Sequence, residues 1–121
     1  MSKESLIFIE HILQNIEDID SFMRGVSKDE LKKNKEKLNA IVRSIEIIGE
    51  ATKNLPESFK NKYPKIPWKK IIGTRDLMIH RYFGVDFDAV WDIIKKDLPE
   101  LKTKILKIKK DLKRSNETPG T

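Results

Sequence analysis

Apolar residues recur along this chain at intervals of three and four, the spacing that gathers side chains on one face of an α-helix. Alternation with a period of two is not sustained, and glycine is sparse, so the pattern gives strands little support. The first apolar stripe comprises Phe8, Ile9, Ile12, Leu13, Ile16, Ile19 and Met23. Gly25 suits the position just beyond a helix C-terminus, and Ser27 with Glu30 forms a capping-box pattern that opens the next helix.

The second helical stretch has the most regular spacing. Its apolar positions alternate between steps of three and four, which is typical of a helical bundle. They are Leu38, Ile41, Ile45, Ile48, Thr52 and Leu55. We expect Pro56 to end this helix and residues 56–63 to form a short helix or turn.

The third and fourth stretches follow Pro67, a residue suited to the first turn of a helix. A helix is predicted from about Trp68 to Tyr82; Gly84 would end it, and Asp86 or Asp88 would cap the next helix. The last stripe comprises Phe87, Trp91, Ile94, Leu98, Leu101, Ile105, Ile108 and Leu112. Its phase continues through Pro99, which predicts one long helix bent where the proline cannot donate a hydrogen bond.

Together these stretches predict an all-α fold, an antiparallel up-and-down four-helix bundle with an additional short helix. The 121 residues suit a single domain, assigned to 1–114, followed by a disordered tail at 115–121. The chain has no cysteine, which excludes disulfides and thiolate chemistry and fits a cytoplasmic location. Residues 1–25 carry acids among their apolar positions and no long apolar run occurs, so neither a secretory signal nor a membrane span is expected.

The net charge of +6 is unevenly distributed. Segment 101–114 holds seven basic residues and one acid, and segment 60–70 holds five lysines and no acid. Such segments can meet a phosphate backbone, and they also fit an ordinary solvated surface rich in lysine. Tyr63, which lies between Lys62 and Pro64, is expected to anchor a loop.

Candidate chemistry concentrates between Arg75 and Tyr82. The chain has no glycine-rich phosphate loop and no paired-histidine zinc motif. On a helix, Asp76 and His80 share one face, so the carboxylate can hold the imidazole. Arg75 and His80 differ by about 140° around the axis, a separation that a long arginine or a second subunit could bridge.

An imidazole and a guanidinium suit the cleavage of RNA without a metal. Histidine can take the proton of a ribose 2′-hydroxyl and return one to the leaving oxygen, and arginine matches the charge and shape of the phosphate. The same residues also fit an Asp–His pair and an arginine salt bridge on a bundle surface. Elsewhere, Arg43, Glu46 and Glu50 share a helix face, where they could line the same cleft or form ordinary intrahelical pairs.

The pattern Arg-x4-His-x-Tyr, here Arg75, His80 and Tyr82, resembles that of the HepT-like toxins of the HEPN superfamily. Three separate blocks carry the resemblance, IVRSIEIIGEATKNL at 41–55, YPKIPWKKIIGTRDLMIHRYFGVD at 63–86 and VWDIIKKDLPEL at 90–101. The resemblance covers residues 4–110, although the first helix matches only in pattern.

This resemblance implies a homodimeric, metal-independent endoribonuclease that needs no cofactor and acts in a type VII toxin–antitoxin system. Arg75 and His80 would be catalytic, Asp76 would support them, and the active site would lie in a cleft between subunits. The implied partner is an MntA-type nucleotidyltransferase antitoxin, which would transfer AMP to Tyr82 and block the cleft. Some members of the superfamily bind nucleotides or partners without cleaving RNA, so a non-catalytic module that docks a minimal nucleotidyltransferase is the alternative.

Overall fold

The structure is a computed structural model that describes residues 3–81 and 87–117, with side chains described for 4–74 and 87–114. Every element in these two ranges is a helix, which confirms the all-α class. The elements are α1 (Lys3–Met23), α2 (Lys28–Lys33), α3 (Lys35–Asn54), α4 (Glu57–Asn61), α5 (Trp68–Arg81), α6 (Phe87–Asp92), the π-helix η1 (Ile93–Asp97) and α7 (Leu98–Glu117). No helix among the described residues is long and apolar enough to cross a membrane.

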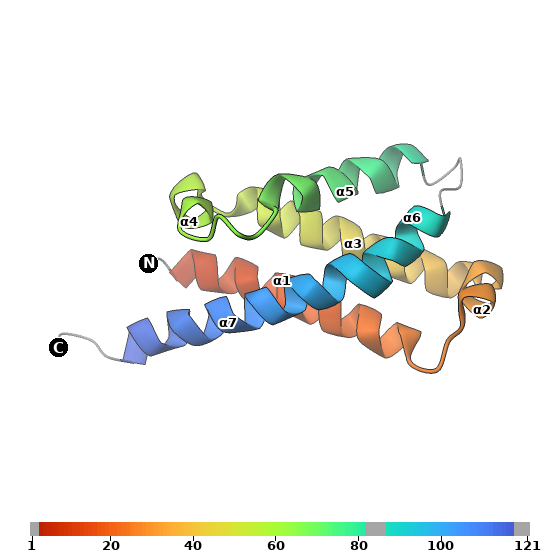
Figure 1. Cartoon of the computed structure of the whole chain (residues 1–121), viewed down its shortest axis with the longest axis horizontal. Coiled ribbons are helices and arrows are strands. Elements are labelled where there is room, and N and C mark those ends of the chain that lie inside the picture. The colour runs from red at the N-terminus through yellow and green to blue at the C-terminus, as the bar shows by residue number, and fades with distance from the viewer. Residues whose placement is uncertain (1–2, 82–86, 118–121) are drawn as a thin grey trace.

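The long helices run alternately in opposite directions (Figure 1). Helix α1 packs against α3 and α7, and α3 also packs against α5, so α3 is a central element as its regular apolar spacing predicted. The up-and-down four-helix bundle with an additional short helix stays a prediction. A small cavity lies between α5 and the η1–α7 segment.

The core forms where the apolar stripes of α1, α3 and α7 meet. Most of the deepest side chains are aliphatic and at most 2% exposed, and they follow the predicted spacing of three and four. They include Ile9, Ile12, Ile16 and Ile19 of α1, Ile41, Ile45 and Ile48 of α3, and Ile105 and Ile108 of α7. Burial of these stripes fixes α3, against which α5 packs.

The joints between the first helices follow local sequence signals. Gly25 has a φ of 71°, the left-handed conformation that glycine adopts without steric cost. The predicted capping box is confirmed, since the Ser27 hydroxyl accepts a hydrogen bond from the Glu30 amide and the Glu30 carboxylate accepts one from the Ser27 amide. The sequence pattern did not reveal a break at Asn34, which ends α2 and caps α3 by accepting from the Lys37 amide at 3.0 Å.

Prolines mark two of the predicted helix boundaries as expected. Leu55 is extended, the conformation that a following proline favours, so α3 stops at Asn54 before Pro56. The short helix predicted after Pro56 is α4. Pro67 stands immediately before the first residue of α5, and its carbonyl accepts the Ile71 amide at 3.1 Å.

Pro99 is accommodated by a π-helix. Proline lacks the amide that would bond to the carbonyl four residues earlier, and its ring crowds that carbonyl. The Leu98 amide instead bonds to the Ile93 carbonyl, five residues back, which widens the turn just before the proline. The apolar stripe was predicted to stay on one helix face through Pro99. This is confirmed, because its residues from Phe87 to Leu112 are buried, except for the half-buried Trp91.

One boundary differs from the sequence expectation. Of the two residues expected to cap α6, Asp88 lies in the first turn, where its carboxylate pairs with Lys28 at 2.9 Å, and a cap by Asp86 stays a prediction. Helix α7 continues to Glu117, three residues into the predicted tail, and residues 118–121 lie outside the described residues, as do Gly84 and Asp86.

Candidate functional site

The candidate site is carried by α5, whose first turn is anchored by Trp68. This side chain is 8% exposed, and its indole Nε1 donates to the carbonyls of Lys60 and Tyr63, each at 3.1 Å. The Phe59 ring lies between the other two aromatics, with ring centroids 5.2 Å from Tyr63 and 6.4 Å from Trp68. These contacts tie the start of α5 to α4 and to the loop before it.

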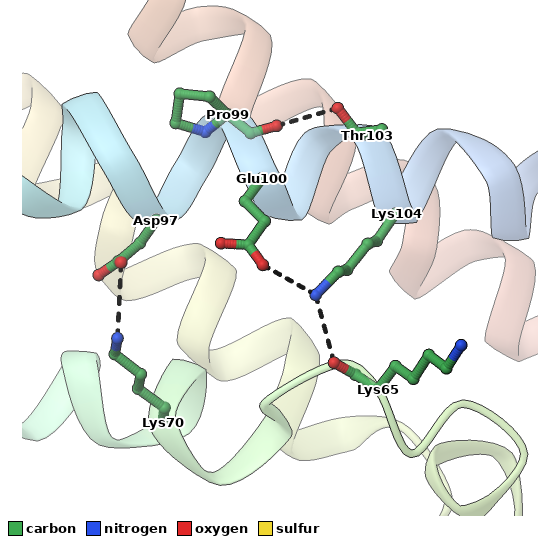
Figure 2. Close-up of polar contacts among 7 residues, drawn as sticks. All are labelled: Lys65, Lys70, Asp97, Pro99, Glu100, Thr103 and Lys104. Atoms are coloured by element: carbon green, nitrogen blue, oxygen red, sulfur yellow. Dashed lines mark hydrogen bonds and ion pairs between the residues drawn. The ribbon is translucent and has the colours of Figure 1, made fainter.

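Helix α5 packs along α3 and faces η1 and α7 across a small cavity. The cavity has a volume of about 70 Å³ and a mostly apolar lining that includes Ile48, Ile71 and Leu101. Polar contacts cross its edge (Figure 2). The Lys70 ammonium approaches the Asp97 carboxylate at 3.5 Å, which links α5 to η1.

A second bridge links α7 to the loop that precedes α5. The Lys104 ammonium donates to the Glu100 carboxylate at 3.0 Å and to the Lys65 carbonyl at 3.3 Å (Figure 2). These groups are partly exposed, and such pairs contribute at most about 1 kcal/mol each. They orient the side chains around the cavity edge, while the packing of α5 on α3 holds the helix in place.

The structure describes the backbone of the predicted motif only in part. Arg75, Asp76 and His80 lie in the C-terminal half of α5, which is one uninterrupted helix at these positions. Helical geometry puts positions 75 and 80 about 7.5 Å apart along the axis and about 140° apart around it. The side chains of these three residues, and all of Tyr82, lie outside the described residues.

Arg43 and Glu46 form the intrahelical pair that the sequence favoured, at 3.4 Å. With Glu50 they line a groove of about 360 Å³ between α1 and α3, together with Phe8 and His11. The lining of the α5 cavity comes instead from Ile45 and Ile48 of α3. Among the described residues, the acidic and basic groups of α3 therefore lie away from that cavity.

A basic groove joins the two lysine-rich segments, 60–70 and 101–114, which are separate in the sequence. It has a volume of about 350 Å³ and is lined by Lys62, Tyr63, Pro64, Lys65, Ile66, Lys104, Lys107, Ile108 and Asp111. The α7 residues of the lining lie at positions 104, 107, 108 and 111, which share one face of a helix, so this side of the groove was predictable from the sequence. The approach of the loop to that face depends on tertiary packing and could not be predicted from the sequence.

Tyr63 anchors the loop, as expected, and also forms part of this groove. Burial, together with the negative charge of Asp111, raises the pKa of the Tyr63 phenol above its usual value. The phenol therefore stays protonated and neutral at physiological pH.

The fold and these surfaces define an all-α domain with a basic groove and a long helix bearing an Arg-x4-His motif. The family model described as "Ribonuclease HepT-like" matches residues 12–108. The chain therefore belongs to the HepT-like ribonuclease family, and its predicted family is confirmed.

Relatives match over most of this chain. A protein of Thermococcus cleftensis named "Probable ribonuclease HepT" is 40% identical over 110 residues, which cover 91% of this chain and 100% of the relative. A protein of Methanocaldococcus jannaschii named as a "Putative RNase" is 43% identical over 115 residues, 95% of each chain.

A longer relative contains a matching segment. It is a protein of Methanocaldococcus jannaschii named as a "Gamma-glutamylcyclotransferase and putative RNase", 46% identical over 112 residues. The match covers 93% of this chain, which spans only 50% of that relative's length. No solved structure gives a significant match.

Proposed function

We propose that this protein is a metal-independent endoribonuclease whose catalytic groups are Arg75 and His80. The observation that carries the proposal is the intact Arg-x4-His motif on α5 of a chain that belongs to the HepT-like ribonuclease family. The RNase names of full-length relatives support the same activity.

The proposed reaction is an internal transesterification. Neutral His80 accepts the proton of a ribose 2′-hydroxyl, the 2′-oxygen attacks the adjacent phosphorus, and the bond to the 5′-oxygen breaks. A protonated imidazole donates to that leaving oxygen, and Arg75 binds the negative phosphoryl oxygens. Asp76, four positions before His80, favours the charged imidazole. The products are a 2′,3′-cyclic phosphate and a free 5′-hydroxyl.

We further propose that two subunits form the active site. Positions 75 and 80 point about 140° apart on one helix, so a single copy of α5 does not readily direct both groups at one phosphate. A homodimer that brings two copies of this helix together in a cleft would let Arg75 of one copy act beside His80 of the other. The prediction is a dimeric mass in light scattering at the assay concentration, and a monomeric active species would contradict it.

The biological role we propose is that of a toxin in a type VII toxin–antitoxin system. Tyr82 follows His80 by two residues, so an adenylate on its phenol would add bulk and negative charge beside the catalytic histidine and oppose RNA binding. An MntA-type nucleotidyltransferase would transfer AMP from ATP to the phenol oxygen, which loses its proton, and pyrophosphate would leave. Incubation with such an enzyme and ATP should add one AMP mass to wild type and none to Tyr82→Phe, with loss of RNA cleavage only in wild type.

The test of the catalytic proposal is RNA cleavage in excess EDTA by wild type, His80→Ala and His11→Ala. His11 is the matched control, because it is the chain's second histidine and lies exposed on α1. Cleavage by wild type and His11→Ala but not by His80→Ala is expected. Dependence on Mg²⁺, or unchanged cleavage by His80→Ala, would refute the proposal. An inactive wild type that still binds a nucleotidyltransferase would favour the non-catalytic docking module.

A further inference from the structure

The two lysine-rich segments of the chain meet at one surface. The Lys104 ammonium of α7 bonds to the Lys65 carbonyl at 3.3 Å, across 39 residues of sequence. Loop residues 62–66 and the 104–111 face of α7 then line the two sides of the basic groove. The convergence of separate basic segments makes this groove different from a single solvated lysine-rich helix.

The groove carries an excess of available positive charge. The side-chain ammonium groups of Lys62, Lys65 and Lys107 form no hydrogen bond or ion pair with any residue in the described ranges. In Figure 2 the Lys65 side chain extends away from the Lys104 contact, so its charge is not used by the bridge. Asp111 is the single acid in the lining. Such a concentration of free lysines attracts a polyanion.

The floor of the groove is apolar and includes an aromatic ring. Tyr63, Pro64, Ile66 and Ile108 contribute to its lining. Tyr63 is half-buried and held by the Phe59 ring at 5.2 Å, so part of its surface is fixed and accessible. Lysines beside an exposed aromatic surface suit a single-stranded nucleic acid, because phosphates meet the ammonium groups and bases stack on the ring.

We propose that this groove binds a segment of the single-stranded RNA substrate away from the scissile bond. The proposal rests on the ribonuclease function above and adds a second contact region to it. Helix α5 leads from this loop to the motif, and Trp68 and position 80 are about 18 Å apart along its axis. An RNA strand that follows α5 would therefore reach the groove a few nucleotides from the cleaved phosphate.

Binding is tested with a fluorescent single-stranded oligonucleotide whose riboses are 2′-O-methylated, which prevents attack by the 2′-oxygen. The groove variant is Lys62→Gln with Lys107→Gln. The control variant is Lys33→Gln with Lys35→Gln, which removes the same charge from exposed positions on α2 and α3. Loss of two phosphate contacts should weaken binding and reduce the slope of log affinity against log salt by about 1.4, with little change in the control.

The aromatic contribution is tested by Tyr63→Leu, which retains an apolar contact for Phe59. Binding of the same probe should weaken by about fivefold or more, because stacking of one base is lost. Far-UV circular dichroism must match wild type for this comparison. If folded Tyr63→Leu binds the probe with unchanged affinity, the Tyr63 ring does not contact the RNA.

Equal binding by the groove variant and wild type, or an equal loss in the control variant, would overturn the proposal. Retained RNA binding with loss of nucleotidyltransferase binding would also overturn it and assign the groove to the protein partner.

Cleavage distinguishes the two proposals. For an active wild type, the groove variant should lose more kcat/KM on a long RNA than on a dinucleotide. If the wild type binds the probe through these lysines but cleaves no RNA, the proposal that the groove binds RNA is supported and the ribonuclease proposal is refuted.

Discussion

Replacement of Trp68 by Phe tests whether the indole anchors the start of α5. The substitution keeps an aromatic ring beside Phe59 and removes the Nε1 donor that the Lys60 and Tyr63 carbonyls share at 3.1 Å. Neither carbonyl becomes an orphan. The Tyr63 amide still donates to the Lys60 carbonyl at 3.1 Å, and the Ile66 amide to the Tyr63 carbonyl at 3.2 Å.

The expected cost follows from these partners. One shared donor contributes about 1 kcal/mol net, and the usual penalty for an unsatisfied buried carbonyl does not apply. The smaller ring buries less apolar surface and leaves a space, which adds about 1 kcal/mol. Trp68→Phe should therefore lower the free energy of unfolding by about 2 kcal/mol.

Urea denaturation followed by far-UV circular dichroism measures this loss. The matched control is Trp91→Phe, since Trp91 is only half-buried and its ring contacts the Lys95 ammonium at 5.0 Å. The control should lose less than about 1 kcal/mol, because a half-buried ring contributes less buried area than a fully buried one. Equal losses in the two variants would refute the assignment of Trp68 as the anchor of α5.

Three further predictions have defined outcomes. Ile105→Ala removes a fully buried side chain and should cost about 2–5 kcal/mol in urea denaturation, while Leu106→Ala, 44% exposed, should stay within about 0.5 kcal/mol of wild type. The capping hydrogen bonds with Ser27 lower the pKa of the Glu30 carboxyl below its usual 4.5. The ionised Glu30 carboxylate therefore stabilises the fold above pH 4.5, and this stabilisation is lost as the pH falls through the lower pKa of the folded state. The melting-temperature difference between wild type and Glu30→Gln should therefore shrink as the pH falls below about 4, and a constant difference would contradict the capping assignment. Asp111→Asn removes the acid of the basic groove and should tighten binding of the methylated RNA probe about threefold at low salt, whereas weaker binding would contradict the charge argument.

The fold was largely predictable because its determinants are local. Apolar spacing gave the buried faces of α1, α3 and α7, and the capping box and prolines marked several helix ends. The break at Asn34 was missed, since an exposed polar residue between two helical patterns carries little periodic signal. Pro99 has no amide N–H, so the sequence predicts that one backbone hydrogen bond is absent there. It does not distinguish a simple bend from the five-residue π-helix that the structure contains.

The candidate site was predictable to a different extent. The residues Arg75, Asp76 and His80 were identified from a motif, and α5 supplies the continuous helix that their spacing assumed. Their catalytic roles stay predictions. The basic groove could not be derived in full, because Lys65 and Lys104 meet only through the packing of the loop against α7. Charge along a sequence indicates a surface, whereas tertiary contacts determine which charged segments share it.

The most direct test of the ribonuclease proposal is the chemistry of the RNA ends produced by wild type in excess EDTA. Attack by the 2′-oxygen, with His80 as base and Arg75 bound to the phosphate, predicts 2′,3′-cyclic phosphates and 5′-hydroxyls. These ends should be absent with His80→Ala or Arg75→Ala and present with His11→Ala. Products with 3′-hydroxyl and 5′-phosphate ends, or cyclic ends that persist in both motif variants, would contradict the account.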